Sequence, residues 1–426
     1  MGRQMNFTNA RHTTELLLAA IYFERAPDRS FHSFTYSKPN RPNLIGNLGI
    51  ELNYNDHALT TAVLYLRRHG APHLRALSVS DVRSQLTKFV SENFWTISSE
   101  AWDSRSTESF VTFLSDSAKQ AMADAMAKST LFVEPRELTL FPLSVVKVSA
   151  SFVSMDFFLV PPSALTPELI GSPASKQQID PNQFPPFDGS RWKRQPTTSW
   201  LGIWAPNIET AKRQRAVILG AIALLPHPME RYLFTGRTVT HGWCRLHGNQ
   251  YTVSLDGPHT PAMSEDVVVS EDDHDWLALL ASSLASPQKA SKKRMLALAY
   301  QYRSWVPDST RRFPTLFAAL DAIYGDASQA TQAVVDAVRP VMGPDYDFKR
   351  LRLLLSLRAS VIHGGAPNVY ESSNYHRYYE DYRTDAVRDL ELIVARCLQV
   401  EIFGNALCER PHTFADLLFK KTGRRV

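Results

Sequence analysis

The stretch from Leu351 to Gly365 reads LRLLLSLRASVIHGG, and its pattern decides how the last third of the chain can fold. At about 100° per residue in an α-helix, three of its leucines (351, 354 and 355) share one apolar stripe with Val361 and Ile362. Arg358 falls in the middle of that stripe, where a charge is costly unless it is paired or opens onto a polar cavity. The stretch therefore predicts an amphipathic helix with one charged side chain on its packed face.

Apolar periodicity of the same kind predicts further helices on both sides of this stretch. They are centred on residues 295–302, 313–324, 330–338 and 381–403. Five amphipathic helices within about 115 residues can close a single core. We therefore expect an all-α bundle over residues 290–405, followed by a basic tail over residues 406–426.

The region before the bundle has a mixed pattern. Helical spacing recurs at 59–66 and 110–126, whereas residues 143–160 are rich in Val and Phe and predict one or two strands. We expect a mixed α/β domain over residues 1–160. Eight prolines between residues 161 and 196 disfavour both helix and sheet, so this segment is predicted to be a linker or a loop.

Residues 197–285 are expected to continue the N-terminal part. A helix is predicted after Asn207, and residues 236–256 read as a hairpin with its turn at 247–249. The predicted fold class is therefore α+β, with a mixed α/β N-terminal region followed by an all-α bundle.

Composition and charge narrow the classes of function. The chain is 44% hydrophobic and 21% charged, which is ordinary for a globular protein. A net charge of +5 permits an acidic partner such as nucleic acid without requiring one. Three widely spaced cysteines disfavour a disulfide framework. Because the N-terminus lacks a signal-peptide pattern and the longest apolar run is too short to cross a bilayer, we expect a soluble cytoplasmic protein with no membrane partner.

Several other chemistries find no support in the sequence. In a strand, His241 and His247 would share one face and Cys244 would point to the other, so we expect no metal site there. The chain has no Gly-rich phosphate loop ending in Lys-Ser/Thr, no Gly-x-Ser-x-Gly elbow and no Cys-x2-Cys pair. Neither a metal nor a cofactor is therefore predicted.

The spacing Arg358-x4-His363, on a Leu-rich helix followed by glycine, resembles the Arg-x4–6-His motif of HEPN domains. The surrounding segment Ser356–Gly364 is close to the version in Apea-like members. An earlier segment, Phe317–Tyr324, looks like the family's preceding helix, with a similar acidic and aromatic pattern. The resemblance covers residues 290–405. One departure is Ala359, which stands where many active members have Asn, Asp or His.

This resemblance implies a metal-independent endoribonuclease. His363 would act as general base or acid toward the RNA 2′-hydroxyl and the leaving oxygen, and Arg358 would hold the scissile phosphate. The products would carry 2′,3′-cyclic phosphate and 5′-hydroxyl ends. Members usually bring the motifs of two protomers together, which implies a homodimer. Proteins of this layout serve as bacterial anti-phage effectors of abortive infection, in which an N-terminal part responds to a phage-derived trigger and the bundle cleaves cellular RNA such as tRNA.

Four further residues are candidates for RNA binding. Lys349, Arg350 and Arg352 lie on or near the motif helix and could bind phosphates. Tyr378 belongs to a run of aromatic and basic residues after the motif, which could stack unpaired bases. A solvated basic face and a loop packed onto the bundle explain the same residues equally well.

Two other interpretations of the motif stay open at this stage. Arg358 could simply pair with an acidic residue of a neighbouring helix, such as Asp321, and His363 could be a helix cap. The chain would then be a non-catalytic scaffold for dimerisation or RNA binding, an alternative that Ala359 favours. A toxin-like protein silenced by a separate antitoxin is the third class.

Overall fold

A computed structural model describes residues 2–35, 49–103, 107–171, 187–188, 193–194, 197–235, 239–247, 250–325 and 330–411. The chain separates into two compact units, Met1–Arg136 and Glu137–Val426, which are described one at a time. Both contain helices and strands, and the C-terminal region is helical, so the predicted α+β class is confirmed.

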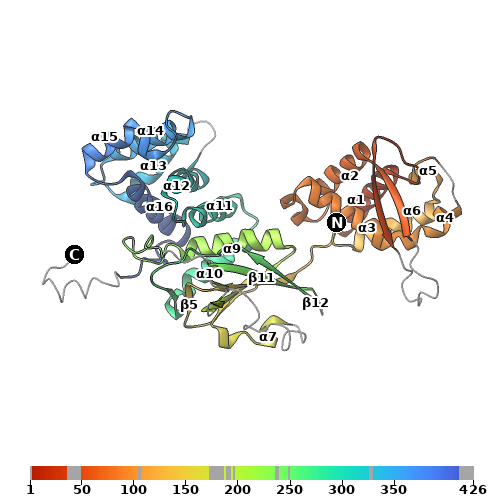
Figure 1. Ribbon diagram of the computed structural model, residues 1–426, viewed down its shortest axis with the longest axis horizontal. Helices are drawn as coiled ribbons and strands as arrows, with labels where there is room; N and C mark the ends of the chain where they lie inside the picture. Colours follow the sequence, from red (N-terminus) through yellow and green to blue (C-terminus); the bar gives the residue numbers. More distant parts are fainter. Residues whose placement is uncertain are drawn as a thin grey trace. The chain divides into compact units, whose positions relative to one another are not determined.

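The first unit packs helices around a small antiparallel sheet of order β1-β3-β2 (Figure 1). Its strands are β1 (Ile21–Tyr22), β2 (Arg29–Thr35) and β3 (Gly49–Asn55). Its longer helices are α1 (Gly2–Ala19), α2 (Asp56–His69), α3 (Val79–Asn93) and α6 (Asp116–Lys128), with the short α4 (Ser98–Asp103) and α5 (Phe110–Phe113) between the last two. One apolar cluster joins these elements, so the unit has a core of its own.

The second unit is built on a larger sheet. Its strand order is β6-β7-β10-β4-β11-β8-β9, and β12 pairs with β11. The strands are β4 (Glu137–Leu143), β6 (Phe152–Val153), β7 (Phe157–Val160), β8 (Phe187–Asp188), β9 (Lys193–Arg194), β10 (Ser199–Ala205), β11 (Val239–His247) and β12 (Gln250–Asp256). A separate parallel pair joins β5 (Val146–Val148) to β13 (Val267–Val269). The antiparallel pairing of β11 with β12, which starts at His247 opposite Gln250, confirms the predicted hairpin.

The proline-rich segment lies within this unit and does not link two domains. Strands on either side of it, β7 and β10, pair along Phe157–Val160, and β8 within it pairs with β11. Its described part also contains the short helix α7 (Pro167–Ile170), in which proline occupies the first turn. The segment is therefore part of the second unit, and the expectation that its prolines disfavour both helix and sheet is wrong at α7, β8 and β9.

Helices make up the rest of the second unit. They are α9 (Ile208–Ile222), α10 (His274–Ala285), α11 (Lys289–Ser304), α12 (Ser309–Tyr324), α13 (Ala330–Met342), α14 (Phe348–Ile362), α15 (Ser373–Tyr382) and α16 (Ala386–Phe403). The four helices predicted before residue 365 are present. The fifth, expected from residue 381, begins instead at Ala386, because Arg383 adopts a left-handed backbone conformation (φ 52°) that separates it from α15.

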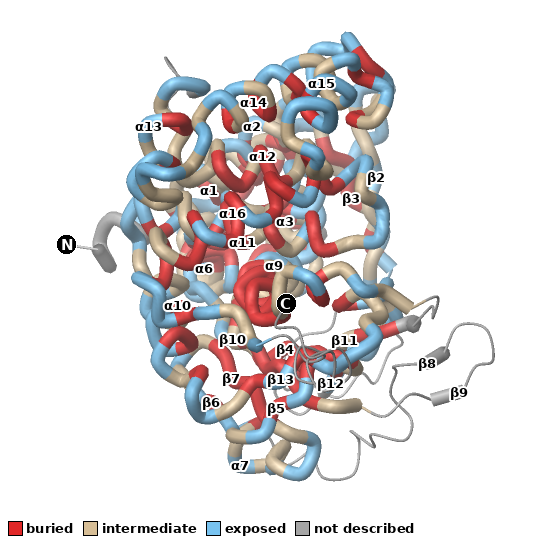
Figure 2. The backbone as a smooth tube through the Cα atoms, turned by 90° about the vertical axis from the view of Figure 1, so that its left-hand side faces the viewer, coloured by how far each residue is buried: buried red, intermediate tan, exposed pale blue. Residues whose placement is uncertain are grey.

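One core serves both the sheet and the bundle. A single apolar cluster runs from Phe141 on β4 through α9 to Leu407 beyond the last helix. Helix α9 lies between the sheet and α11, and Figure 2 shows its buried residues in red. It approaches α11 so closely that a Cβ placed on Gly220 would lie 2.0 Å from the carbonyl oxygen of Leu298. Only a glycine permits this spacing of the two helix backbones.

The shared core corrects the predicted domain limits. The break falls after Arg136 and not near residue 160, because β4 pairs with β10 and β11 later in the chain. Residues 290–405 form a bundle that is continuous with the sheet layer and not a separate compact unit. The predicted tail is described only as far as residue 411, so its basic end lies outside the described residues. Within the described residues, no helix combines the length and apolar character needed to cross a membrane.

The close approach of α9 and α11 leads to a test of the fold. We expect Gly220→Ala to lower the free energy of unfolding by about 1–3 kcal/mol, because the new methyl group must displace backbone atoms of α11. Urea unfolding monitored by circular dichroism measures the change. Gly257→Ala is the matched control, because nothing lies within 4 Å of the position that its methyl group would take. Equal stability of the two variants would contradict the shared core.

Candidate functional site

The motif helix α14 ends where the sequence predicts. Asp347 caps its start by accepting a hydrogen bond from the backbone of Lys349 at 2.8 Å. Its C-cap is His363, and Gly364 follows with a φ of 76°, a left-handed conformation that glycine adopts without strain. The turn is closed by a hydrogen bond from the backbone of Ala366 to the carbonyl of Ser360. The imidazole of His363 is therefore carried by the last turn of the helix, and the residue is exposed.

Arg358 leaves the packed side of α14 and meets Asp321 on α12. Its Nη2 donates to Asp321 Oδ2 at 2.5 Å, and its guanidinium carbon lies 5.7 Å from the centre of the Phe317 ring. The two charged side chains keep 23% and 28% of their surface exposed, so the pair lies at the edge of the core. Burial raises the pKa of the Asp321 carboxyl, an effect that the positive charge of Arg358 opposes.

Arg358 and His363 thus point to different sides of one helix. Five residues separate them, which corresponds to about 140° around the helix axis. Arg358 is directed toward α12, whereas His363 belongs to the exposed side. The structure therefore confirms the pairing of Arg358 with Asp321 and does not bring the two motif side chains together within one chain.

Two of the four predicted RNA-binding residues share the exposed side with His363. Lys349 and Arg352 are both exposed, and at 100° per residue they fall within about 60° of His363 around the helix. The three residues form a basic stripe about 21 Å long, since α14 rises 1.5 Å per residue. We call these three residues the α14 stripe.

The other two predicted RNA-binding residues are turned inward. Tyr378 on α15 is fully buried, and its hydroxyl donates to the carboxylate of Asp389 on α16. Arg350 donates from Nε to the Tyr378 hydroxyl at 2.9 Å and also pairs with Asp389. These three side chains connect α14, α15 and α16. The prediction that Tyr378 stacks on a base is not compatible with this arrangement, because its ring has no exposed face.

Two features of the bundle escaped the sequence analysis. Residues 373–382 form helix α15 and not a loop, and Tyr375, Tyr378 and Tyr382 recur in it at the i, i+3, i+7 spacing of one helix face.

The second feature is the buried ion pair between Arg312 on α12 and Glu391 on α16, which is 2.8 Å long. Burial raises the pKa of Glu391 to about 7, and the nearby charge of Arg312 opposes this shift. No sequence signal links two residues so far apart in the chain.

A second polar cluster lies beneath the large sheet. His241 and His259 stack with their ring centres 4.9 Å apart, and Nε2 of His241 is 2.9 Å from the hydroxyl of Ser144. His259 Nε2 lies 2.7 Å from the carbonyl of Gly242, and Nδ1 lies 2.6 Å from Arg215. Arg215 can only donate, so Nδ1 accepts and Nε2 donates. These two contacts require the imidazole of His259 to be neutral, so we interpret the cluster as structural.

A metal site at the hairpin stays unsupported. His241 faces His259, whereas Cys244 packs in the apolar cluster on the other side of the sheet with Leu140 and Leu246. The side chain of His247 lies outside the described residues.

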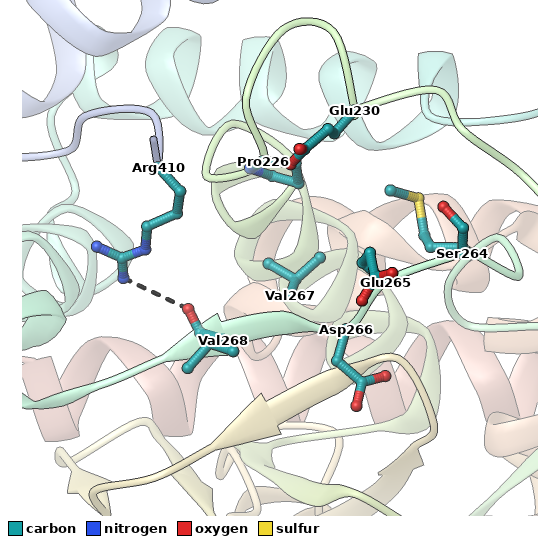
Figure 3. Close-up of a pocket in the computed structure, with 9 residues that line it drawn as sticks. Pro226, Glu230, Ser264, Glu265, Asp266, Val267, Val268 and Arg410 are labelled. Atoms are coloured by element: carbon teal, nitrogen blue, oxygen red, sulfur yellow. Dashed lines mark hydrogen bonds between the residues drawn. The ribbon is translucent and has the colours of Figure 1, made fainter. Parts of the chain in front are cut away.

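A small cavity of about 240 Å³ lies between the loop after α9, β13 and Arg410 (Figure 3). Its acidic lining residues are Glu230, Glu265 and Asp266. Arg410 donates to the carbonyl of Val268, as the dashed line in Figure 3 marks, and pairs with Asp273. Neither Arg358 nor His363 lines this cavity, so it is separate from the motif.

Comparisons of the chain with protein-family models, with curated proteins and with solved structures gave no match. The resemblance to HEPN domains therefore depends on the residues of the motif and its neighbouring helix alone.

The geometry of His259 predicts a pH-dependent stability. Burial first, and then the charge of Arg215, lowers the pKa of His259 well below its ordinary value near 6.5. The unfolded chain therefore binds a proton that the folded chain does not, and stability is lost as the pH falls below about 6.5. Between pH 7.5 and 5.5 we expect His259 to account for a loss of about 1.4 kcal/mol.

The test compares urea unfolding of the wild type and of His259→Gln at both pH values. A glutamine amide can accept from Arg215 and donate to Gly242 without titrating. The variant should therefore lose less stability on acidification than the wild type. The same pH dependence in both proteins would refute a neutral, buried His259.

Proposed function

We propose that this protein is a HEPN-type, metal-independent endoribonuclease in which the α14 stripe binds RNA and His363 transfers the proton at the 2′-hydroxyl. The observation that carries the proposal is the exposed histidine at the end of a basic stripe, with an arginine on the same helix. Histidine titrates near neutral pH and suits general acid–base chemistry. Lys349 and Arg352 supply the phosphate contacts that position a polyanion.

Arg358 is proposed to bind the scissile phosphate. Its bond to Asp321 uses one nitrogen and one carboxylate oxygen, and Oδ1 of Asp321 has no hydrogen-bond partner among the described residues. Such a single contact holds an arginine less firmly than a bidentate pair. The partial exposure of the guanidinium leaves a route for a phosphate to replace or extend this contact.

A homodimer is part of the proposal. Because Arg358 and His363 lie about 140° apart around α14, one chain does not present both to the same phosphate. Residues from two protomers need not share a helix, so a composite site removes this constraint. The further expectations, cellular RNA such as tRNA as substrate, a phage-derived trigger, a role in abortive infection and a cytoplasmic location, follow from the family resemblance and are proposed on that ground.

The alternative function is a non-catalytic scaffold that dimerises or binds RNA. The pairing of Arg358 with Asp321 favours it, because a structural ion pair explains a charge on the packed face of α14 without any catalytic role.

Cleavage of RNA by the full chain in the presence of EDTA separates the two functions. We expect the wild type to leave 2′,3′-cyclic phosphate and 5′-hydroxyl ends, and His363→Ala to lower the rate at least about 100-fold, because general acid–base catalysis contributes that much. His376→Ala, which removes another exposed histidine of the bundle, should cleave normally. Cleavage by His363→Ala at the wild-type rate would rule out the proposed site, and RNA binding without cleavage by the wild type would favour the scaffold.

The α14 stripe predicts a specific salt dependence of RNA binding. We expect Lys349→Ala and Arg352→Ala each to weaken binding and to reduce the slope of log K against log salt by about 0.7, the value for one phosphate contact on a single strand. Tyr378→Phe should leave the slope unchanged and lower stability instead, since its hydroxyl binds Arg350 and Asp389. Fluorescence anisotropy with a labelled oligonucleotide measures the slopes. A reduced slope in Tyr378→Phe, or unchanged slopes in both alanine variants, would contradict this assignment.

A further inference from the structure

A groove of about 810 Å³ runs along the seam between α9 and α11. Figure 1 shows the two helices side by side, and Ser283 and Leu284 of α10 contribute to the lining together with Ser286, which caps that helix. Arg358 and His363 do not line this groove. It is therefore a separate surface feature of the second unit.

The floor of the groove is aliphatic. It is formed by Ala216 and Val217 of α9 and by Met295, Leu296 and Ala299 of α11. Leu296 keeps 46% of its surface exposed, although it belongs to a stripe of α11 that has the spacing of a packed face. This stripe of α11 therefore faces an open groove. An apolar stripe of this spacing normally packs against another helix or a sheet.

The rim of the groove is basic. Lys212 and Arg213 of α9 and Lys292 and Arg303 of α11 line it, against the single carboxylate of Glu209. Lys212 shares its charge with Asp256 at 3.7 Å, whereas Lys292 and Arg303 lie on the opposite wall. The potential in the groove is accordingly positive, which selects for a partner with negative side chains.

The shape and chemistry of the lining distinguish between classes of polyanion. No aromatic side chain is among the described residues that line the groove, so it lacks the stacking platform on which single-stranded RNA bases are held. From Lys292 to Arg303 the lined wall is about 16 Å long, which corresponds to three helical turns. An aliphatic floor of this length between two helices matches the helix-in-groove mode of recognition.

We propose that the α9–α11 groove binds an amphipathic helix of a partner protein, with aliphatic residues facing the floor and acidic residues facing the rim. The bound helix would pack as a third helix against α9 and α11. This inference is independent of the proposed ribonuclease activity, because it uses none of the residues of the α14 stripe.

The probe is a stapled, fluorescein-labelled peptide of about 16 residues, with leucine at the i, i+3, i+4, i+7 positions of one face and glutamate elsewhere. The staple holds the helix, which a peptide of this length barely forms by itself. We expect the full chain to bind it with a Kd of about 10 µM or tighter, measured by fluorescence anisotropy. The same peptide with lysine in place of glutamate should bind at least about tenfold more weakly.

Two pairs of variants localise the binding. Leu296→Glu should weaken binding at least about tenfold, whereas Leu279→Glu, on α10 outside the groove and 44% exposed, should not change it. Lys292→Glu should also weaken binding, and Lys289→Glu, an exposed residue of the same helix outside the lining, should not. Circular dichroism checks that all four variants are folded.

Four outcomes would overturn the proposal. The first three are no binding of the glutamate peptide up to about 1 mM, equal binding of the lysine peptide, and equal losses in the groove variants and their controls. A fourth is binding of a 15-nucleotide oligo(U) that is lost in Leu296→Glu, since the groove would then be an RNA site. The RNA-cleavage assay with His363→Ala is unaffected by any of these outcomes, so the two proposals fail separately.

Discussion

The close contact between α9 and α11 is the constraint on which the rest of the second unit depends. Because Gly220 lets the two helix backbones approach, the sheet layer and the helical bundle share one apolar core. This explains why the run from Ala216 to Leu225 is almost continuously apolar, since a helix covered on both sides loses its polar face. It also explains the groove, because the two helices meet at Gly220 and leave an open seam beside the crossing.

Local apolar periodicity predicted the helices of the bundle well. It could not predict which strands pair with each other across long stretches of the chain. The stripes that identify α11, α12 and α14 are encoded within a few residues, and each helix is present. The domain limit at Arg136 is set by hydrogen bonds between β4 and strands that lie about 60–100 residues later in the chain. A single sequence holds no local signal for such pairing, so residues 137–160 were assigned to the wrong unit.

The candidate site was predictable in part for the same reason. Helical geometry on its own places Arg358 on the packed side of α14 and His363 about 140° away, as the structure has them. Helical geometry could not tell that Lys349 is exposed and that Arg350 points inward. The inward orientation of Arg350 depends on Tyr378 and Asp389 from two other helices. Basic residues next to a motif are thus weak evidence for RNA contact until their side of the helix is known.

Three arginines of the bundle point inward, and their partners differ in a way that bears on function. Arg312 and Arg350 pair with Glu391 and Asp389, whose side chains are 8% and 11% exposed, and each of these arginines has further hydrogen bonds. An inward-pointing arginine with an acidic partner therefore recurs in this bundle and by itself says little about catalysis. Arg358 differs because the side chain of its partner, Asp321, is 28% exposed. A partly exposed ion pair contributes little to stability, so the bond to Asp321 is one that a phosphate could replace, as the proposed function requires.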